Sequence, residues 1–179
     1  FLASNELTGS LPSELGNLVK LADSFALENN VLTGAVPTEL GRLSNMGSHV
    51  ELDYQAFSSS IPTQLGNLIK MTSELQLNDN SMTGTLPTQL GRMTGLVNSF
   101  RFLETNKFTG SIPTEFGKLT AITMGFDLSS NSLSAAIPTE LGNLVRLTDT
   151  FKLASNQLCD DVPTEVQALS EIADTSWAV

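Results

Sequence analysis

Histidine and carboxylate side chains alternate in one short stretch of this 179-residue chain. His49, Glu51 and Asp53 stand two residues apart, and Glu28 and Glu74 lie 25 residues before Asp53 and 25 residues after His49. Side chains two residues apart point to the same face of a β-strand, so a 25-residue repeat would place all five on one surface. Such groups can bind a cation, and paired carboxyl groups can act as general acid and base.

The geometry of a strand limits this chemistry. Parallel side chains on a flat strand do not wrap an ion, and His49 and Asp53 would lie about 13 Å apart. We therefore assign no metal ion and no cofactor to the stretch and interpret it as a polar recognition surface. The sequence contains no nucleophile and base pair and no glycine-rich phosphate loop, so we predict that the protein is not an enzyme. A carboxylate-based hydrolase is the enzymatic alternative.

The elements that must position these side chains recur along the whole chain. All seven prolines lie in copies of one motif, TGAVPTELGRL at residues 33–43, and successive prolines are 25 residues apart with one step of 26. Such a period predicts a solenoid in which each repeat forms one coil and the stacked coils share a continuous core. With 40% hydrophobic residues, the chain is long enough for one such domain.

Two columns of residues predict the inner side of each coil. Apolar pairs two residues apart, such as Phe25 and Leu27, indicate strands with one buried face. The predicted parallel strands centre on Leu27, Leu52, Leu77, Phe102, Leu128 and Leu153. After each strand an asparagine can hydrogen-bond buried backbone groups at the turn, which predicts a ladder. Its members are Asn5, Asn30, Asn80, Asn106, Asn131 and Asn156.

Further positions predict the rest of the coil. Gly34 stands before the Val-Pro step, where a backbone with positive φ fits. Leu40, Leu43 and Met46 follow the proline at intervals of three residues, which suits a short 3-10 or α-helical turn on the convex side. In the third repeat Gln55 replaces the ladder asparagine, which indicates either drift tolerated by the ladder or scaffold residues given up for a site.

These motifs resemble the leucine-rich repeats of the plant-specific class. The segments FDLSSNSL at residues 126–133 and IPTEFG at 112–117 match the pattern of that class, although each unit is one residue longer, as in algal leucine-rich repeat proteins. The resemblance implies an α/β repeat fold: a right-handed solenoid with a parallel β-sheet on the concave face and short 3-10 or α segments on the convex face. It also implies a protein that binds ligands rather than transforming them.

We divide the chain into a solenoid at residues 1–163, with a partial first unit, and a C-terminal cap at 164–179, where Trp177 would cover the last apolar layer. Because the chain begins in mid-repeat, we expect the first coil to fray or self-associate. Cys159 stands where plant-type arrays often have a cysteine of a capping disulfide, whose partner would lie beyond Val179. A small buried thiol and a reactive thiol are the alternatives.

The net charge of −10 disfavours binding to nucleic acid or to anionic membranes, and no apolar run is long enough for membrane insertion. We predict a protein or peptide partner, neutral or basic, in an extracellular or other extracytoplasmic compartment. The alternative function is a structural spacer or a peripheral subunit of a larger complex. The candidate ligand-binding residues on the concave face are Glu28, His49, Glu51, Asp53, Tyr54, Glu74, Gln76, Asn78, Arg101, Asp127 and Lys152.

Overall fold

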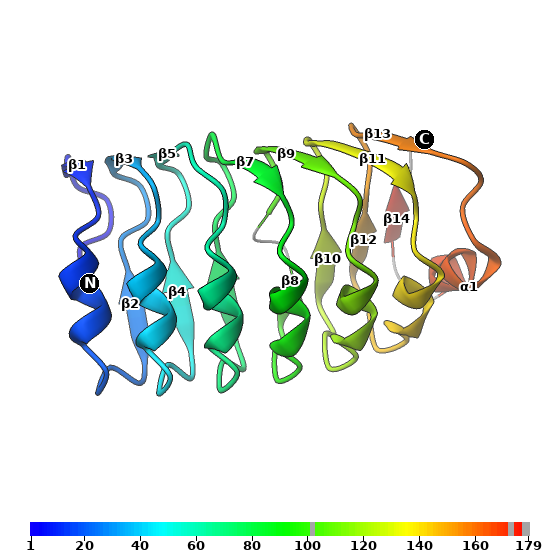
Figure 1. Cartoon of the computed structure of the whole chain (residues 1–179). Helices are drawn as coiled ribbons and strands as arrows, with labels where there is room; N and C mark the ends of the chain where they lie inside the picture. The colour runs from blue at the N-terminus through cyan, green and yellow to red at the C-terminus, as the bar shows by residue number, and fades with distance from the viewer. Residues whose placement is uncertain (101–102, 172–173, 177–179) are drawn as a thin grey trace.

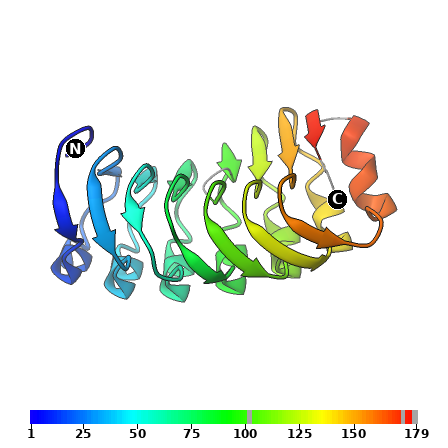
Figure 2. The same cartoon turned by 90° about the horizontal axis from the view of Figure 1, so that it is seen from above.

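The chain forms a stack of coils in which each proline motif contributes one coil (Figure 1). The computed structural model describes residues 1–100, 103–171 and 174–176. Figure 2 shows from above that the stack curves gently from its N-terminal to its C-terminal coil. All strand pairs in the described residues are parallel, because each strand pairs with the equivalent strand of the next coil.

The concave sheet contains one short strand from each coil after the first. Its strands pair in the orders β2-β4-β6 and β8-β10-β12-β14. They are β2 (Ser24–Ala26), β4 (His49–Glu51), β6 (Glu74–Gln76), β8 (Ser99–Phe100), β10 (Gly125–Asp127), β12 (Thr150–Lys152) and β14 (Asp174–Ser176).

The predicted strand centres were wrong by two residues. The middle residues are Phe25, Val50, Leu75, Phe126 and Phe151, and Phe102 lies outside the described residues. The strand ends early because the chain turns: Asn29, two residues after Leu27, already has a φ of 56°. Leu27 itself is buried at the start of this turn.

A second sheet runs along one side of the stack. Its strands pair in the orders β1-β3-β5 and β7-β9-β11-β13. They are β1 (Thr8–Ser10), β3 (Val31–Gly34), β5 (Ala56–Phe57), β7 (Thr83–Thr85), β9 (Lys107–Gly110), β11 (Ser132–Ala136) and β13 (Gln157–Cys159). The glycine column lies here, and Gly34 has the predicted positive φ, 79°.

Short 3-10 helices line the convex side. They are η1 (Ser13–Asn17), η2 (Thr38–Arg42), η3 (Thr63–Asn67), η4 (Thr88–Arg92), η5 (Thr114–Lys118), η6 (Thr139–Asn143) and η7 (Ala168–Glu171), and α1 (Thr164–Gln167) precedes η7. Each of η1 to η6 follows a proline in the extended conformation, which suits the residue before a helix. A Cβ on the glycine of each of these helices would lie less than 3 Å from a backbone carbonyl oxygen of the next coil, so no other residue fits there without a shift.

Stacked side chains fill the space between the sheets and the helices. In the C-terminal half the rings of Phe100, Phe126 and Phe151 stack with centroids 5.0 and 5.2 Å apart, and Phe116 packs against Phe100. In the third and fourth coils the aliphatic residues Val50 and Leu75 take the equivalent positions. Each coil therefore buries its apolar face only by stacking on its neighbours.

The last part of the described chain continues this stack. Residues 164–171 form α1 and η7, and β14 pairs with β12. The boundary at residue 163 stays a prediction, and the expected position of Trp177 lies outside the described residues. Cys159 is exposed and free, so the buried-thiol alternative was wrong. Within the described residues, no helix is both long and apolar enough to cross a membrane.

Candidate functional site

The turn after each concave strand is held by the ladder residue. The amide of Asn80 donates to the carbonyl oxygens of Leu52, Leu77 and Asn78 at 3.0 to 3.1 Å, and its oxygen accepts a bond from the N–H of Phe57. The same pattern occurs at Asn30, Asn106, Asn131 and Asn156, whereas Asn5 bonds only within its own coil. These bonds fix where each concave strand ends.

The third coil keeps the ladder with a different residue. Gln55 accepts a bond from the N–H of Leu32 and donates to the carbonyl of Leu27. The residue before it, Tyr54, is 51% exposed and has a φ of 51°. The third coil therefore retains its scaffold while presenting an aromatic ring at the edge of the concave face.

His49 and Glu74 form the first row of the concave face. They are direct partners in the register of β4 and β6. The two ring nitrogens of His49 lie 2.7 Å from the hydroxyl of Ser48 and 2.9 Å from that of Ser73. Asn98 donates to the same Ser73 hydroxyl, so the imidazole belongs to a hydrogen-bonded chain across neighbouring coils.

Acidic residues crowd the following rows. Asp53 is 5% exposed, and its Oδ1 has no hydrogen-bond partner; the same is true of the buried Oε2 of Glu28 in the preceding coil. Burial raises the pKa of Asp53 from 3.8 to about 6; a hydrogen bond to its own backbone opposes this rise, and the charges of Glu28, Glu51 and Asp79 add to it. Burial and then the charge of Glu28 also raise the pKa of Glu51.

The side-chain amides of Gln76 and Asn78 donate hydrogen bonds to other carboxylates of the cluster. Gln76 donates to Glu74 Oε2 at 2.6 Å, and Asn78 donates to Asp79 Oδ2 at 2.9 Å. The phenol of Tyr54 is near Asp79, whose charge raises the pKa of Tyr54. The structure thus brings the N-terminal candidates together in one cluster over β2, β4 and β6.

The C-terminal candidates are arranged differently. Asp127 is buried and accepts bonds from the N–H and the hydroxyl of Ser129, so its carboxylate stabilises the strand end. Lys152 is partly exposed on β12, and Arg101 lies outside the described residues. Asp127 and Lys152 are several coils away from Asp53 and do not join its cluster.

The sequence candidates did not include Asp79 or the hydrogen-bonded neighbours of His49, which are Ser48, Ser73 and Asn98. Asp79 lies at the turn before Asn80, where a φ of 51° directs its side chain away from the alternating strand pattern. Ser73 precedes β6, and its hydroxyl contacts His49. Asp79 could have been found from the sequence, because it directly precedes the ladder residue Asn80 and therefore lies in the turn. Nothing in the sequence singled out Ser73.

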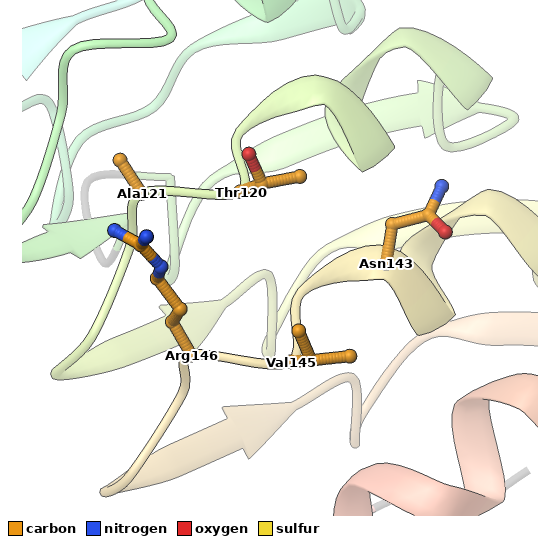
Figure 3. Close-up of a pocket in the computed structure, with 5 residues that line it drawn as sticks. All are labelled: Thr120, Ala121, Asn143, Val145 and Arg146. Carbon is orange, nitrogen blue, oxygen red and sulfur yellow. The ribbon is translucent and has the colours of Figure 1, made fainter.

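The described residues contain no group of three or more His, Cys, Asp or Glu side chains arranged to hold a metal ion. A separate hollow of about 420 Å³ lies on the convex side, lined by Thr120, Ala121, Asn143, Val145 and Arg146 (Figure 3). There the Arg146 side chain extends toward Ala121 from the next coil. Its polar lining residues, Thr120, Asn143 and Arg146, are all exposed, so this hollow holds no buried polar group comparable to Asp53.

Solved structures with this architecture include receptor ectodomains and an ice-binding protein. The leucine-rich repeat ectodomain of the membrane receptor kinase GASSHO1/SCHENGEN3 from Arabidopsis thaliana, in complex with CASPARIAN STRIP INTEGRITY FACTOR 2, is 34% identical with a TM-score of 0.87; the match covers 98% of this chain and 20% of that chain. The plant peptide hormone receptor RGFR1 in complex with RGF2 is 27% identical with a TM-score of 0.81, covering 98% and 32%. A plant ice-binding protein is 28% identical with a TM-score of 0.75, covering 90% and 50%.

These similarities confirm the predicted leucine-rich repeat solenoid. The chain spans 20% and 32% of the lengths of the two receptor ectodomains. No family model and no curated protein sequence matches it.

Proposed function

We propose that this chain, which is a plant-type leucine-rich repeat protein, is a non-enzymatic module that recognises a peptide or a segment of another protein through its concave sheet. One observation carries the proposal: the concave surface of β2, β4 and β6 gathers Glu28, Glu51, Asp53 and Glu74, and Asp53 among them is buried without a full set of hydrogen bonds. Buried polar groups without partners are rare in native proteins and need an explanation.

The structural neighbours support recognition of peptides and proteins. The two receptor ectodomains were solved with CASPARIAN STRIP INTEGRITY FACTOR 2 and with RGF2. An ectodomain faces away from the cytoplasm, which supports an extracytoplasmic location for this chain as well. The acidic cluster favours a partner segment that is neutral or basic, because an acidic segment would be repelled.

Association kinetics test this proposal. Partners are first captured from the native source and identified by mass spectrometry. The Glu51→Lys, Asp53→Lys double variant is then compared with wild type at low salt, where steering by charge is strongest. We expect association about tenfold slower or more, with the difference shrinking at high salt.

The matched control carries the same charge change on the convex side. Glu14→Lys with Glu140→Lys reverses two exposed carboxylates on η1 and η6. Its association rate should stay near that of wild type. If the control slows association as much as the concave variant, or if neither has an effect, concave recognition is wrong and the spacer alternative becomes the better account.

A second candidate function, adsorption to ice, is favoured by the second sheet. One exposed row along this sheet is small and hydroxylated, formed by Thr33, Thr83 and Thr109 with Ser58 directly after β5, and it runs beside larger exposed residues such as Val31 and Lys107. The hydroxyls of Thr33, Thr83 and Thr109 donate to a carbonyl of the preceding coil, which holds them in a regular row. The similarity to a plant ice-binding protein supports this candidate.

Inhibition of ice recrystallisation by the purified chain tests the second candidate. Lysine at Thr83 and Thr109 should abolish the inhibition because long charged side chains interrupt the row. Lysine at Thr88 and Thr114, which are exposed on η4 and η5, is the control and should leave it unchanged. Wild type without inhibition rules out ice adsorption and leaves the concave proposal untouched.

A further inference from the structure

Two buried carboxylate oxygens on neighbouring coils lack hydrogen-bond partners. They are Oε2 of Glu28 and Oδ1 of Asp53, and no described donor reaches either of them. The two residues are equivalent positions of consecutive repeats, and strands of consecutive coils are about 4.8 Å apart. An unpaired buried charge is costly, because neither water nor a protein dipole compensates it fully.

Neighbouring negative charges make ionisation of these carboxyl groups still less favourable. Glu51 and Asp79 add negative charge around Asp53, and no basic side chain acts on its carboxylate. In the next coil the side-chain amides of Gln76 and Asn78 donate to Glu74 and Asp79. The arrangement is therefore complementary to a positive group with several donors.

Tyr54, the residue after Asp53, has an unusual backbone conformation. Its φ of 51° lies in the left-handed region, which costs a residue with a Cβ about 1–2 kcal/mol. The equivalent positions with positive φ in other coils hold small or short polar residues: Ser4, Asn29, Asp79, Thr105, Ser130 and Ser155. A bulky ring held in a strained conformation, and half exposed beside two carboxylates that each have an unpartnered oxygen, is typical of a functional site.

We propose that Glu28, Asp53 and Tyr54 form a subsite for one arginine side chain of a bound peptide. This inference rests on the proposed function of the concave face and adds the chemical class of the group that binds there. The planar guanidinium carries five donors in a fixed fork, enough to bond to one carboxylate oxygen of each residue once the two side chains turn toward the concave surface. The ring of Tyr54 offers a surface on which the guanidinium can stack.

A small metal ion fits this arrangement less well. Calcium takes six to eight oxygen ligands at about 2.3–2.6 Å, and these carboxylates come from parallel side chains on successive coils. The described residues form no group that would hold a metal ion. A guanidinium bridges oxygens that are farther apart, because its donors point in different directions.

The test uses a probe rather than the unidentified natural ligand. N-acetyl-arginine amide is titrated into the full ¹⁵N-labelled chain, and the backbone amides of Leu52 to Gln55 are followed by NMR at pH 7.5. N-acetyl-citrulline amide has nearly the same shape without the charge, and N-acetyl-lysine amide has the charge without the planar fork. We expect arginine to bind at least tenfold more tightly than citrulline and several-fold more tightly than lysine.

Two isosteric variants and one control identify the residues. Asp53→Asn and Glu28→Gln should each weaken arginine binding about tenfold, because each removes a charge-assisted bond. Both variants relieve repulsion, so both should fold. Glu140→Gln, an exposed carboxylate on η6, should bind as wild type does.

Three results would overturn the subsite: equal binding of arginine and citrulline, equal binding of arginine and lysine, or wild-type binding in Asp53→Asn. Saturation of the same amides by calcium chloride, without a response to arginine, would also overturn it in favour of a metal site. The proposed function can survive such a result. If the natural partner still associates more slowly with the Glu51→Lys, Asp53→Lys variant, concave recognition stands and only the arginine subsite is lost.

Discussion

The amide of Gln55 donates to the carbonyl oxygen of Leu27 at 2.6 Å, which is the bond that Asn80 makes to Leu52 one coil later. The longer glutamine side chain spans the same gap and also accepts a bond from the N–H of Leu32. The third coil thus departs from the repeat without breaking the ladder. Its unusual residues, Asp53 and Tyr54, lie on the concave surface rather than in the scaffold.

The ladder is the basis of a first prediction. Replacing Asn80 by alanine leaves the N–H of Phe57 and the carbonyl of Leu52 without their side-chain partner, which should lower the free energy of unfolding by about 1–3 kcal/mol. Asn67→Ala, at an exposed position on η3, removes the same side chain without removing a buried bond. Urea titration of both variants checks this. Equal losses would contradict the role of the ladder.

The spacing of the convex helices gives a second prediction. A Cβ on Gly66 would clash with the backbone carbonyl of Gln89 in the next coil. Because backbone cannot move aside as a flexible side chain can, Gly66→Ala should destabilise the fold by about 2–3 kcal/mol. Thr63→Ala, exposed on the same helix, should change stability by less than about 0.5 kcal/mol. A mild effect of Gly66→Ala in thermal unfolding would show that the coils can separate there.

The sixth coil allows a stabilising change. Ala135 has a φ of 69°, whereas Gly110 holds the equivalent position of the preceding coil with a φ of 77°. Ala135→Gly should therefore stabilise the protein by about 0.5–1 kcal/mol, since the relief of left-handed strain exceeds the entropy that glycine loses on folding. Ala136→Gly, one residue later in β11, relieves no strain and should destabilise it. Calorimetry should give melting temperatures that move in opposite directions.

Much of the scaffold could be predicted from the sequence because every coil repeats the same constraints. The asparagine, glycine and proline columns each correspond to one backbone requirement, and the positive φ of Gly34 and Gly84 agrees with that interpretation. The predicted strand centres were displaced because the second residue of each apolar pair, such as Leu27, lies at the start of the turn and not in the strand. It is nevertheless buried, as a strand residue facing the core would be. Apolar spacing does not distinguish these two positions.

The candidate site was less predictable. Alternation places Glu51 and Asp53 on the concave face, but their burial depends on the side chains of adjacent coils. Asp79 joins the cluster through the left-handed turn before Asn80, a geometry that period-two spacing does not describe. Which carboxylates receive a side-chain amide, as Glu74 and Asp79 do from Gln76 and Asn78, is visible only in the three-dimensional arrangement.

Asp53 gives the last prediction, which concerns pH. Its pKa is raised from 3.8 to about 6 in the folded chain, with burial as the main cause. The folded state therefore holds the proton more tightly than the unfolded state, so the contribution of Asp53 to stability is full below about pH 4 and is lost as pH rises through 6. A difference of about 2 pKa units corresponds to about 3 kcal/mol, and screening by solvent at the concave surface reduces this to about 1–2 kcal/mol.

Asp53→Asn removes the charge. Its free energy of unfolding should therefore be about 1–2 kcal/mol higher than that of wild type at pH 7.5, and the difference should vanish near pH 4. Urea titrations of both proteins between pH 4 and pH 8 measure this curve. Glu140→Gln, with the same change of charge at an exposed position, should follow wild type throughout. A variant less stable than wild type at pH 7.5 would mean that the Asp53 carboxylate is satisfied within the fold, and the case for a cationic ligand at this position would fall with it.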